Sequence, residues 1–482
     1  MSESLLSSVD TLLNQVNGFL WGNILIVVLP LAGIIFLVFS RFLPFRYFGH
    51  AISVLRGKYD DPNDPGQISH FEALSSALAA TVGMGNIAGV ALAISTGGPG
   101  ALFWMWVIAF LGIATKYFTC TLAVMFRGYD AYGELQGGPM YVIREGLGKA
   151  WVWLGVIFSF AAMIGCLPIF QANQLTKGIE YLLLIPNNIT TADDTSSKWI
   201  IGAVIMVIVG VIIVGGIQRI GKIASQLVPA MVVIYFLSVF GILVLNIDAV
   251  PETFAMIFRD AFTAEAKLGG ALGALFIIGL RRAAFSNEAG IGTAPMAHGA
   301  AKTTEPVREG LVAMLGPAID TLIVCTLTAI AILITGVWQD PEALASIDSG
   351  LDNNTRGILL TGLAFSQSFG ELGGYLLMLC VSIFAITSLF SYSYYGAKCA
   401  NYLFAPFMQR MGWRVRPELL YNIFYATTIL FGAVASMSTV VTIIEIAFAI
   451  MAIPTLVSTI ALMHHVMKAS KDYFQRLRTN RV

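Results

Sequence analysis

Residues 81–91 read TVGMGNIAGVA, which places Gly83, Gly85 and Gly89 inside an apolar segment that extends from about 72 to 95. Residues 284–300 read AFSNEAGIGTAPMAHGA and interrupt a second apolar segment in the same way. Backbone groups that leave a helix inside hydrocarbon are costly unless something binds them. We therefore expect two broken helices whose free backbone groups meet a ligand in the middle of a membrane.

Close helix packing is the alternative interpretation, because Gly85 and Gly89 also form a G-x-x-x-G motif. A single segment of this kind would not separate the two interpretations. Two interruptions at equivalent places favour a binding site. Gly83 and Gly85 are then predicted to resist even a methyl group, because a ligand approaches the backbone there.

The composition excludes an ordinary soluble protein. Of the 482 residues, 57% are hydrophobic and 12% are charged, whereas soluble domains carry about 25% charged residues. The 31 Phe, 16 Tyr and 8 Trp are too much apolar surface for a disordered chain. The formal net charge is zero, so no nucleic-acid partner is indicated. The five cysteines form no CxxC pair and are interpreted as small core side chains in a protein of the lipid bilayer.

Eleven apolar segments are long enough to cross a bilayer, which takes roughly 20 residues. They lie near 20–40, 72–95, 100–126, 151–183, 199–216, 223–246, 270–297, 309–337, 371–404, 417–434 and 439–467. The connections at 41–69, 247–268 and 338–370 are polar. The predicted fold class is an all-α integral membrane protein with eleven transmembrane helices.

Setting the first span aside leaves five spans in each half of the chain. An odd number of spans requires the halves to insert with opposite orientations, so we expect an inverted repeat with discontinuous core helices 1 and 6. The predicted parts are an N-terminal extra helix with a cytoplasmic connector (1–69), the first repeat (70–247), an extracellular connector (248–268), the second repeat (269–467) and a basic cytoplasmic tail (468–482).

The positions of Lys and Arg predict the orientation. With the N-terminus outside, twenty of the 28 lie in the inner loops and the tail, and four lie in the outer loops. Positive charge accumulates on the cytoplasmic side of membrane proteins. The N-terminus is therefore expected outside, and the C-terminal tail in the cytoplasm.

The first break offers groups for both an ion and a substrate. Unwinding around residues 82–86 frees backbone carbonyls that a desolvated alkali cation can use, and Thr81 and Asn86 add side-chain oxygens. The half-helix N-terminus beyond the break presents N–H groups to a substrate carboxylate.

The second break is more polar. It contains Ser286, Asn287 and Glu288, and Arg281 and Arg282 shortly precede it. An ionisable residue at this depth indicates function by default, but Glu288 could equally hold the break open or pair with an arginine. Phe285 is interpreted either as an aromatic lid or as core packing.

Polar residues elsewhere in the spans leave further alternatives open. Gln171 and Gln174 either tie helices together or contact a ligand. Thr387 and Ser388 either bond back to their own helix or face an ion.

Asp320 and Glu445 are lone acids within spans, for which a structural partner is at least as plausible as a role in transport. The five histidines lack metal-ligand spacing, and no role is predicted for them. The sequence has no phosphate loop, nucleophile elbow or HExxH motif, so neither an enzyme nor a bound cofactor is expected.

Several motifs occur together and in register over about 70–400. They are GNIAGVALAISTGGPGALFWMWVIAFLGIATKY from 85, GGPMYVI from 137, FQAN from 170, FSNEAGIGTAPMAH from 285, PVREGL from 306 and IDTLIVCTLTA from 319. Together they resemble the alanine/glycine:cation symporter family. The resemblance implies a bacterial or archaeal inner-membrane protein that carries small neutral amino acids with Na⁺ or H⁺. It also implies a fold of the leucine-transporter type, with ten core helices in two inverted repeats.

The resemblance to that fold can be followed residue by residue. The run Val82–Asn86 is similar to the pattern V-G-L-G-N of core helix 1, and Phe285–Gly292 is similar to F-T-L-S-L-G-F-G of core helix 6. The implied Na⁺ site uses two backbone carbonyls of core helix 1, one carbonyl of core helix 8 and two hydroxyls of core helix 8. Its ligands would be Ala79, Val82, Phe384, Thr387 and Ser388.

The implied substrate site lies beside this Na⁺ site. Thr81, Asn86 and Ser286 would be near a second cation or the substrate. The other implied contacts are Gly83, Gly85, Gln171 and Phe285, with Tyr392 in the pocket wall and Glu288 as a coupling or structural acid.

The chain departs from the family pattern at a few positions. Thr119 stands where the family usually has Glu, and Tyr392 where it has Trp. Glu445 and Phe448 stand where it has Asp and Asn. Since Tyr392 belongs to the expected pocket wall, this departure bears on which amino acid is carried.

The predicted function is symport of a small neutral amino acid of the alanine/glycine class with Na⁺ into the cell by alternating access. Na⁺ is expected as the co-transported ion, with H⁺ as the alternative. Glutamine or serine as the main substrate, and an amino-acid sensor without net transport, are the other hypotheses.

Overall fold

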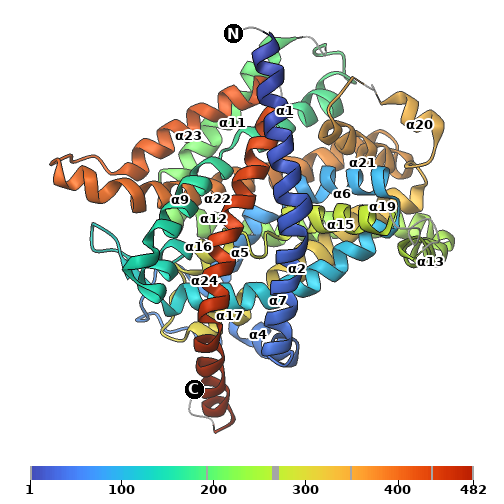
Figure 1. Cartoon of the computed structure of the whole chain (residues 1–482). Helices are drawn as coiled ribbons and strands as arrows, with labels where there is room; N and C mark the ends of the chain where they lie inside the picture. Colours follow the sequence, from blue (N-terminus) through green and yellow to red (C-terminus); the bar gives the residue numbers. More distant parts are fainter. Residues whose placement is uncertain (1–2, 192–193, 263–270, 348–349, 436–437, 480–482) are drawn as a thin grey trace.

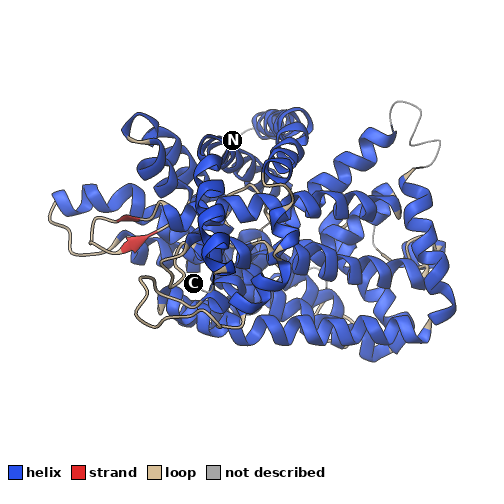
Figure 2. Ribbon diagram, turned by 90° about the horizontal axis from the view of Figure 1, so that it is seen from below, coloured by secondary structure: helices blue, strands red, loops and turns tan. Residues whose placement is uncertain are grey.

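The computed structural model describes residues 3–191, 194–262, 271–347, 350–435 and 438–479. Helices make up most of this part of the chain (Figure 2). The only strands in it are β1 (Gly128–Tyr129) and β2 (Leu135–Gln136), an antiparallel pair in which Gly128 lies opposite Gln136.

The first half of the chain, through residue 261, contains the helices that lead to and follow the first break. They are α1 (Glu3–Phe19), η1 (Leu20–Leu25), α2 (Ile26–Phe39), α3 (Leu43–Arg46), α4 (Phe48–Leu55), α5 (His70–Thr81), η2 (Gly85–Gly89), α6 (Val90–Gly97), α7 (Gly100–Met125), α8 (Pro139–Tyr141), η3 (Val142–Leu147), η4 (Lys149–Trp151), α9 (Val152–Gly165), α10 (Ile169–Ile179), η5 (Glu180–Leu184), α11 (Thr195–Ile213), α12 (Gly216–Leu245), η6 (Ile247–Ala249) and α13 (Val250–Ala261).

The second half begins with the other broken helix. Its elements are α15 (Ala271–Asn287), α16 (Ala294–His298), α17 (Pro306–Ala313), α18 (Leu315–Pro317), η7 (Ala318–Cys325), α19 (Thr326–Thr335), α20 (Pro341–Ser346), α21 (Asn353–Phe369), α22 (Glu371–Arg410), α23 (Pro417–Val434) and α24 (Ser438–Arg478).

Eight helical stretches of the described residues are long and apolar enough to cross a membrane, and the bent pair His70–Thr81 and Gly85–Gly97 makes nine. The two remaining predicted segments are also helical, as α15 with α16 and as α23. Large apolar side chains remain exposed along α2, α11 and α12, where hydrocarbon would solvate them. The chain is therefore a multi-pass membrane protein.

The connections predicted to be polar contain short helices. The connector predicted at 248–268 is helical over Val250–Ala261, and residues 263–268 lie outside the described part, as do 269 and 270 at the predicted start of the second repeat. Thr253, Ile257 and Ala261 are buried at four-residue spacing, so α13 is amphipathic and packs against α7. A search for span-length apolar runs misses such helices because they are short and carry charged residues among the apolar ones.

The break predicted in the first half is confirmed. The helix α5 begins with a capping box, in which Ser69 and Glu72 bond each other's backbone amides, and ends at Thr81. Val82 has an extended backbone (ψ 91°), and the chain continues into η2 and α6 at an angle of 56° to α5.

The break predicted in the second half is confirmed as well. The helix α15 ends at Asn287, and Glu288, Gly290 and Gly292 have φ of 53°, 89° and 106°. Only glycine adopts this left-handed region without a steric cost, so the two glycines permit the turn. Pro295 then opens α16, in the position that suits proline at the start of a helix.

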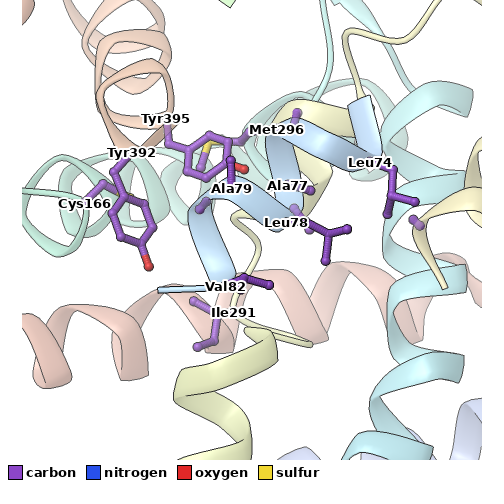
Figure 3. Close-up of a cluster of buried hydrophobic side chains, with 14 of the residues drawn as sticks. Leu74, Ala77, Leu78, Ala79, Val82, Cys166, Ile291, Met296, Tyr392 and Tyr395 are labelled. Atoms are coloured by element: carbon purple, nitrogen blue, oxygen red, sulfur yellow. The ribbon is translucent and has the colours of Figure 1, made fainter. Parts of the chain in front are cut away.

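The two broken helices lie inside the bundle. The first packs against α12 and α22, and the second packs against α7. Figure 3 shows part of this core, with Ala79 of α5 beside Tyr395 of α22, and Val82, which directly follows α5, beside Ile291. Outside it, the helix formed by α1, η1 and α2 runs beside α24 (Figure 1).

Candidate functional site

A cavity of about 230 Å³ lies beside the two breaks. Five of the eight residues predicted to contact a substrate line it: Thr81, Gly85, Gln171, Phe285 and Tyr392. They come from α5, η2, α10, α15 and α22, so the fold brings together residues that are up to 311 positions apart (392 − 81).

The other three predicted substrate contacts lie outside the cavity lining. A Cβ atom placed on Gly83 would be 2.6 Å from Oγ of Ser388 and 3.5 Å from Nε2 of Gln171, so this backbone touches α22 directly. By contrast, a Cβ on Gly85 would meet only the Phe285 carbonyl oxygen, at 3.8 Å. Gly85 therefore has room for a methyl group beside the cavity that it lines, and the close approach of a ligand to its backbone stays a prediction.

Asn86 and Ser286 meet in a buried cluster around Asp320. The Asn86 amide donates to Oδ1 of Asp320 at 2.8 Å and to Oγ of Ser286 at 3.2 Å. Ser286 and Thr321 each donate a hydroxyl hydrogen bond to Oδ2 of Asp320. All four side chains are at most 1% exposed. The cluster joins both breaks to η7, so Asp320, considered from the sequence as a lone acid, has three polar partners.

The residues predicted to bind Na⁺ lie together in the core. Thr387 and Ser388 donate their hydroxyls to the Phe384 carbonyl at 2.9 and 3.0 Å, which puts two hydroxyls and one carbonyl at one point of α22. Ala79 and Val82 are fully buried on the neighbouring end of α5.

The backbone of the first break changes the bonding of those two carbonyls. In a continuous helix, the Gly83 amide would donate to Ala79 and the Asn86 amide would donate to Val82. Here the Gly83 amide donates to Oδ1 of Asn86 at 3.0 Å, and the Asn86 amide donates to the Gly83 carbonyl at 3.1 Å. The Ala79 and Val82 carbonyls therefore lose their usual helical partners beside the hydroxyls of α22.

Glu288 connects the second break to α22. Its carboxylate accepts hydrogen bonds from the hydroxyls of Thr293, across the break, and of Tyr392. It is 1% exposed and does not line the cavity. Of the interpretations left open by the sequence, this geometry favours the one in which Glu288 holds the break in shape.

The amides of α10 have different roles. The Asn173 side chain donates to the carbonyls of Gly432 and Ala435, and so ties α10 to the end of α23. Gln171 lines the cavity, and its buried Oε1 has no hydrogen-bond partner among the described residues. Because an unsatisfied buried oxygen is costly, Gln171 is the amide that is suited to a ligand.

The cavity wall also carries opposite charges. Arg282 of α15 and Glu445 of α24 both line it. Phe285 and Phe448 stack with ring centroids 5.6 Å apart and supply apolar surface beside these charges. The cavity therefore combines a cation, an anion, an amide and aromatic rings.

The side of the protein that carries the C-terminus is closed by backbone contacts. Residues 67–68 pair with residues 300–302, through amide-to-carbonyl bonds such as Lys302 to Ile68 at 2.7 Å. Arg127 donates to the carbonyls of Pro65, Gly299, Ala301 and Thr303. Burial lowers the pKa of Arg127 to about 10, so the guanidinium stays charged at neutral pH.

Two histidines belong to this closed side. The Nδ1 atoms of His70 and His298 each bond one carboxylate oxygen of Glu309, and all three side chains are at most 1% exposed. The three residues join α5, α16 and α17. No role was predicted for these two histidines from the sequence, because the residues that surround the buried Glu309 are distant from one another in the chain.

Lys116 is a buried residue to which the sequence analysis assigned no role. It lies in α7, is 2% exposed, and interacts electrostatically with Asp320 and Glu288. A Cβ on Gly316 would be 3.2 Å from its Nζ, which places the ammonium against α18. The sequence signal that could have identified Lys116 is its charge inside an apolar helix of 26 residues.

Comparison with known proteins gives consistent results. The sodium:alanine symporter family matches residues 6–482. The chain is 37% identical to the sodium/alanine symporter AgcS of Methanococcus maripaludis, over 98% of each chain. It is 34% identical to the probable sodium/glutamine symporter GlnT of Bacillus subtilis, over 95% of this chain and 89% of the other.

A solved structure shows the fold. The crystal structure of MhsT in complex with L-phenylalanine superposes with a TM-score of 0.59 at 16% sequence identity, over 83% of this chain and 89% of MhsT. This similarity agrees with the leucine-transporter-type fold that the resemblance to the symporter family implies. The match over residues 6–482 and the 37% identity to AgcS lead to one conclusion: the chain belongs to the sodium:alanine symporter family, whose members are membrane symporters and not enzymes.

Proposed function

We propose that the protein carries a small neutral amino acid across the membrane together with Na⁺. The observation that carries the proposal is the cavity beside both breaks, which Arg282 and Glu445 line with opposite charges. An amino acid is a zwitterion, so one carboxylate and one ammonium group match this pair.

The size of the cavity supports a small substrate. Its volume of about 230 Å³ is below the roughly 300–1,000 Å³ of pockets for drug-sized ligands. Gln171 offers the substrate an amide, and Phe285, Tyr392 and Phe448 offer it apolar surface. An alanine-sized side chain suits this wall.

The freed carbonyls beside α22 support coupling to Na⁺. Hard cations prefer oxygen ligands, and Ala79, Val82, Phe384, Thr387 and Ser388 offer five of them in a buried place. We assign the Na⁺ site to these residues. Binding of Na⁺ there would hold α5 against α22 and so would shape the cavity beside Gly83.

The cluster around Asp320 is proposed as a second cation position, in which Asn86 and Ser286 would be further ligands. Its carboxylate and hydroxyl oxygens are a donor set suited to a hard cation or a proton, and the Asn86 oxygen, which accepts from the Gly83 amide, would join them only after the amide turns. If Asp320 and Glu288 are both ionised, a charged Lys116 ammonium, which is buried as they are, would balance only one of the two negative charges. One bound monovalent cation would then neutralise this buried group.

Alternating access is the proposed mechanism. The cavity is lined by Asn353 and Asn354 at the start of α21, towards the N-terminal side in Figure 1, whereas the opposite side is closed. With the N-terminus outside a bacterial inner membrane, this is an outward-facing arrangement. The two inverted repeats, 70–247 and 269–467, would then rearrange around the cavity to open the cytoplasmic side.

The test is uptake and counterflow in proteoliposomes that contain the purified protein. Alanine, glycine, serine and glutamine are each measured with and without a Na⁺ gradient, and with a pH gradient in place of Na⁺. We expect Na⁺-stimulated uptake of alanine or glycine. Glutamine is the second candidate because GlnT is a relative. Binding without uptake would indicate a sensor, and failure to bind any of the four would refute the proposal.

A further inference from the structure

The helix that precedes the two repeats carries one buried stripe. Asn17, Trp21, Leu25 and Leu29 are at most 8% exposed, whereas neighbours such as Val27 face outwards. In an α-helix of about 3.6 residues per turn, two residues four positions apart are offset by about 40° around the helix axis. The wider π-helical turn η1, Leu20–Leu25, takes up the extra residue and keeps Asn17, Trp21 and Leu25 on one face.

Trp21 stacks on a residue of the cavity wall. Its ring lies 4.8 Å from that of Phe285 at an interplanar angle of 26°, and Phe285 in turn stacks on Phe448. Phe285 and Phe448 line the cavity, whereas Trp21 does not. Trp21 therefore forms the back of the aromatic wall and supports Phe285 from outside the two repeats.

The same stripe holds the acidic residue of the cavity. The Trp21 indole N–H donates to the backbone carbonyl of Glu445 at 3.0 Å. The Asn17 amide donates to Oε2 of Glu445 at 2.5 Å. Two residues of the N-terminal helix thus fix both the aromatic and the negatively charged part of the wall.

We propose that Asn17 and Trp21 are positioning residues for the substrate, so that the additional helix determines amino-acid affinity through Phe285 and Glu445. The inference rests on the proposed function, because it assumes that the cavity takes an amino acid. Simple anchoring of a membrane helix is the alternative. Anchoring requires only buried apolar contacts, such as those of Leu25, and does not require bonds to two wall residues.

The first experiment compares Trp21→Ala, Trp21→Phe and Leu25→Ala with the wild type in proteoliposomes. Aromatic stacking is worth about 0.5–1.5 kcal/mol, so Trp21→Ala should raise the KM for alanine about 3- to 10-fold and leave the maximal rate within about twofold. Trp21→Phe keeps a ring beside Phe285 and should restore most of the affinity. Leu25→Ala is the matched control, because it shortens a buried residue one turn away that touches neither wall residue by an aromatic or hydrogen-bonding contact.

Asn17→Ala separates the polar contact from the stacking. It removes the hydrogen bond to the Glu445 carboxylate and leaves Trp21 on Phe285. We expect a KM increase of about 10- to 150-fold, the range of a lost hydrogen bond to a charged group. Wild-type KM values in both Trp21→Ala and Asn17→Ala, with only thermal stability reduced, would overturn the proposal.

A second readout does not depend on the substrate. Val441→Cys places a thiol in the cavity lining, while the five native cysteines are buried. A membrane-impermeant thiol reagent should label this residue severalfold faster when Trp21 is replaced by alanine, because Phe285 loses its support. Equal labelling rates in the two backgrounds would overturn the inference. Absence of any uptake by the wild type would instead refute the proposed function, so the two failures are distinguishable.

Discussion

A methyl group at Gly83 tests whether the first break lies against the proposed sodium ligands. A Cβ atom there would be 2.6 Å from Oγ of Ser388 and 3.5 Å from Nε2 of Gln171. Non-bonded contacts become favourable only at about 3.5–4.0 Å, so either the Ser388 side chain or the backbone of the break must move by about 1 Å. The Gly83→Ala substitution therefore disturbs the arrangement of α5 and α22 without removing any oxygen ligand.

Two costs follow from that movement. Ser388 donates its hydroxyl to the Phe384 carbonyl at 3.0 Å, and losing this bond costs about 0.5–1.5 kcal/mol. Forcing a methyl group into a filled place costs about 1–3 kcal/mol. If the cost of about 1–3 kcal/mol for the added methyl group falls on the Na⁺-bound form, the Na⁺ concentration for half-maximal uptake rises about 5- to 150-fold.

Gly85→Ala is the matched control, two residues further along the chain. Its Cβ would meet only the Phe285 carbonyl oxygen, at 3.8 Å, and Gly85 lines the cavity. We expect Gly85→Ala to reduce the uptake of glutamine more than the uptake of alanine and to leave the Na⁺ dependence unchanged. Uptake is measured over a range of Na⁺ concentrations, and thermal unfolding in detergent reports folding. A folded Gly83→Ala protein with the wild-type Na⁺ dependence would refute the placement of the Na⁺ site beside Ser388.

Three further substitutions address the remaining parts of the site. Thr387→Ala removes a proposed Na⁺ ligand worth about 1–3 kcal/mol and should raise the Na⁺ concentration for half-maximal uptake about 5- to 150-fold. Ser393→Ala, on the same helix, is the control and should leave this concentration unchanged. Gln171→Ala should raise the KM for alanine about tenfold with little change in melting temperature, and Asn173→Ala should show the opposite result because its amide holds α10 to α23. Asp320→Asn should keep the fold and abolish Na⁺-stimulated uptake, while amino-acid binding without a gradient weakens; unchanged transport would remove Asp320 from the coupling mechanism.

The broken helices could be predicted from the sequence because their signal is local. Glycines at 83, 85, 290 and 292 interrupt apolar runs and so mark both breaks. The short helices in the connections could not be predicted by the same approach. The helix α21, for example, begins with Asp352 capping its first turn, and its buried face becomes apparent only when it packs against α19 and α22.

Local sequence patterns could not predict which residues distant in sequence contact one another. Asn86 and Asp320 are 234 residues apart, and His70 and Glu309 are 239 residues apart. Each of these residues alone is compatible with several roles, since a polar group within a span indicates a partner without naming it. These partners come into contact only when the two halves of the chain pack against each other.

The pairing of residues 67–68 with residues 300–302 has a consequence for how the protein tolerates genetic variation. Because main-chain atoms form most of these bonds, exchanging side chains along either segment leaves the bonds in place. Arg127 is the exception, since its guanidinium alone reaches four carbonyls of the two segments. Random mutation should therefore rarely produce a transporter that leaks on this side, and the codon for Arg127 should be where such leaky variants concentrate.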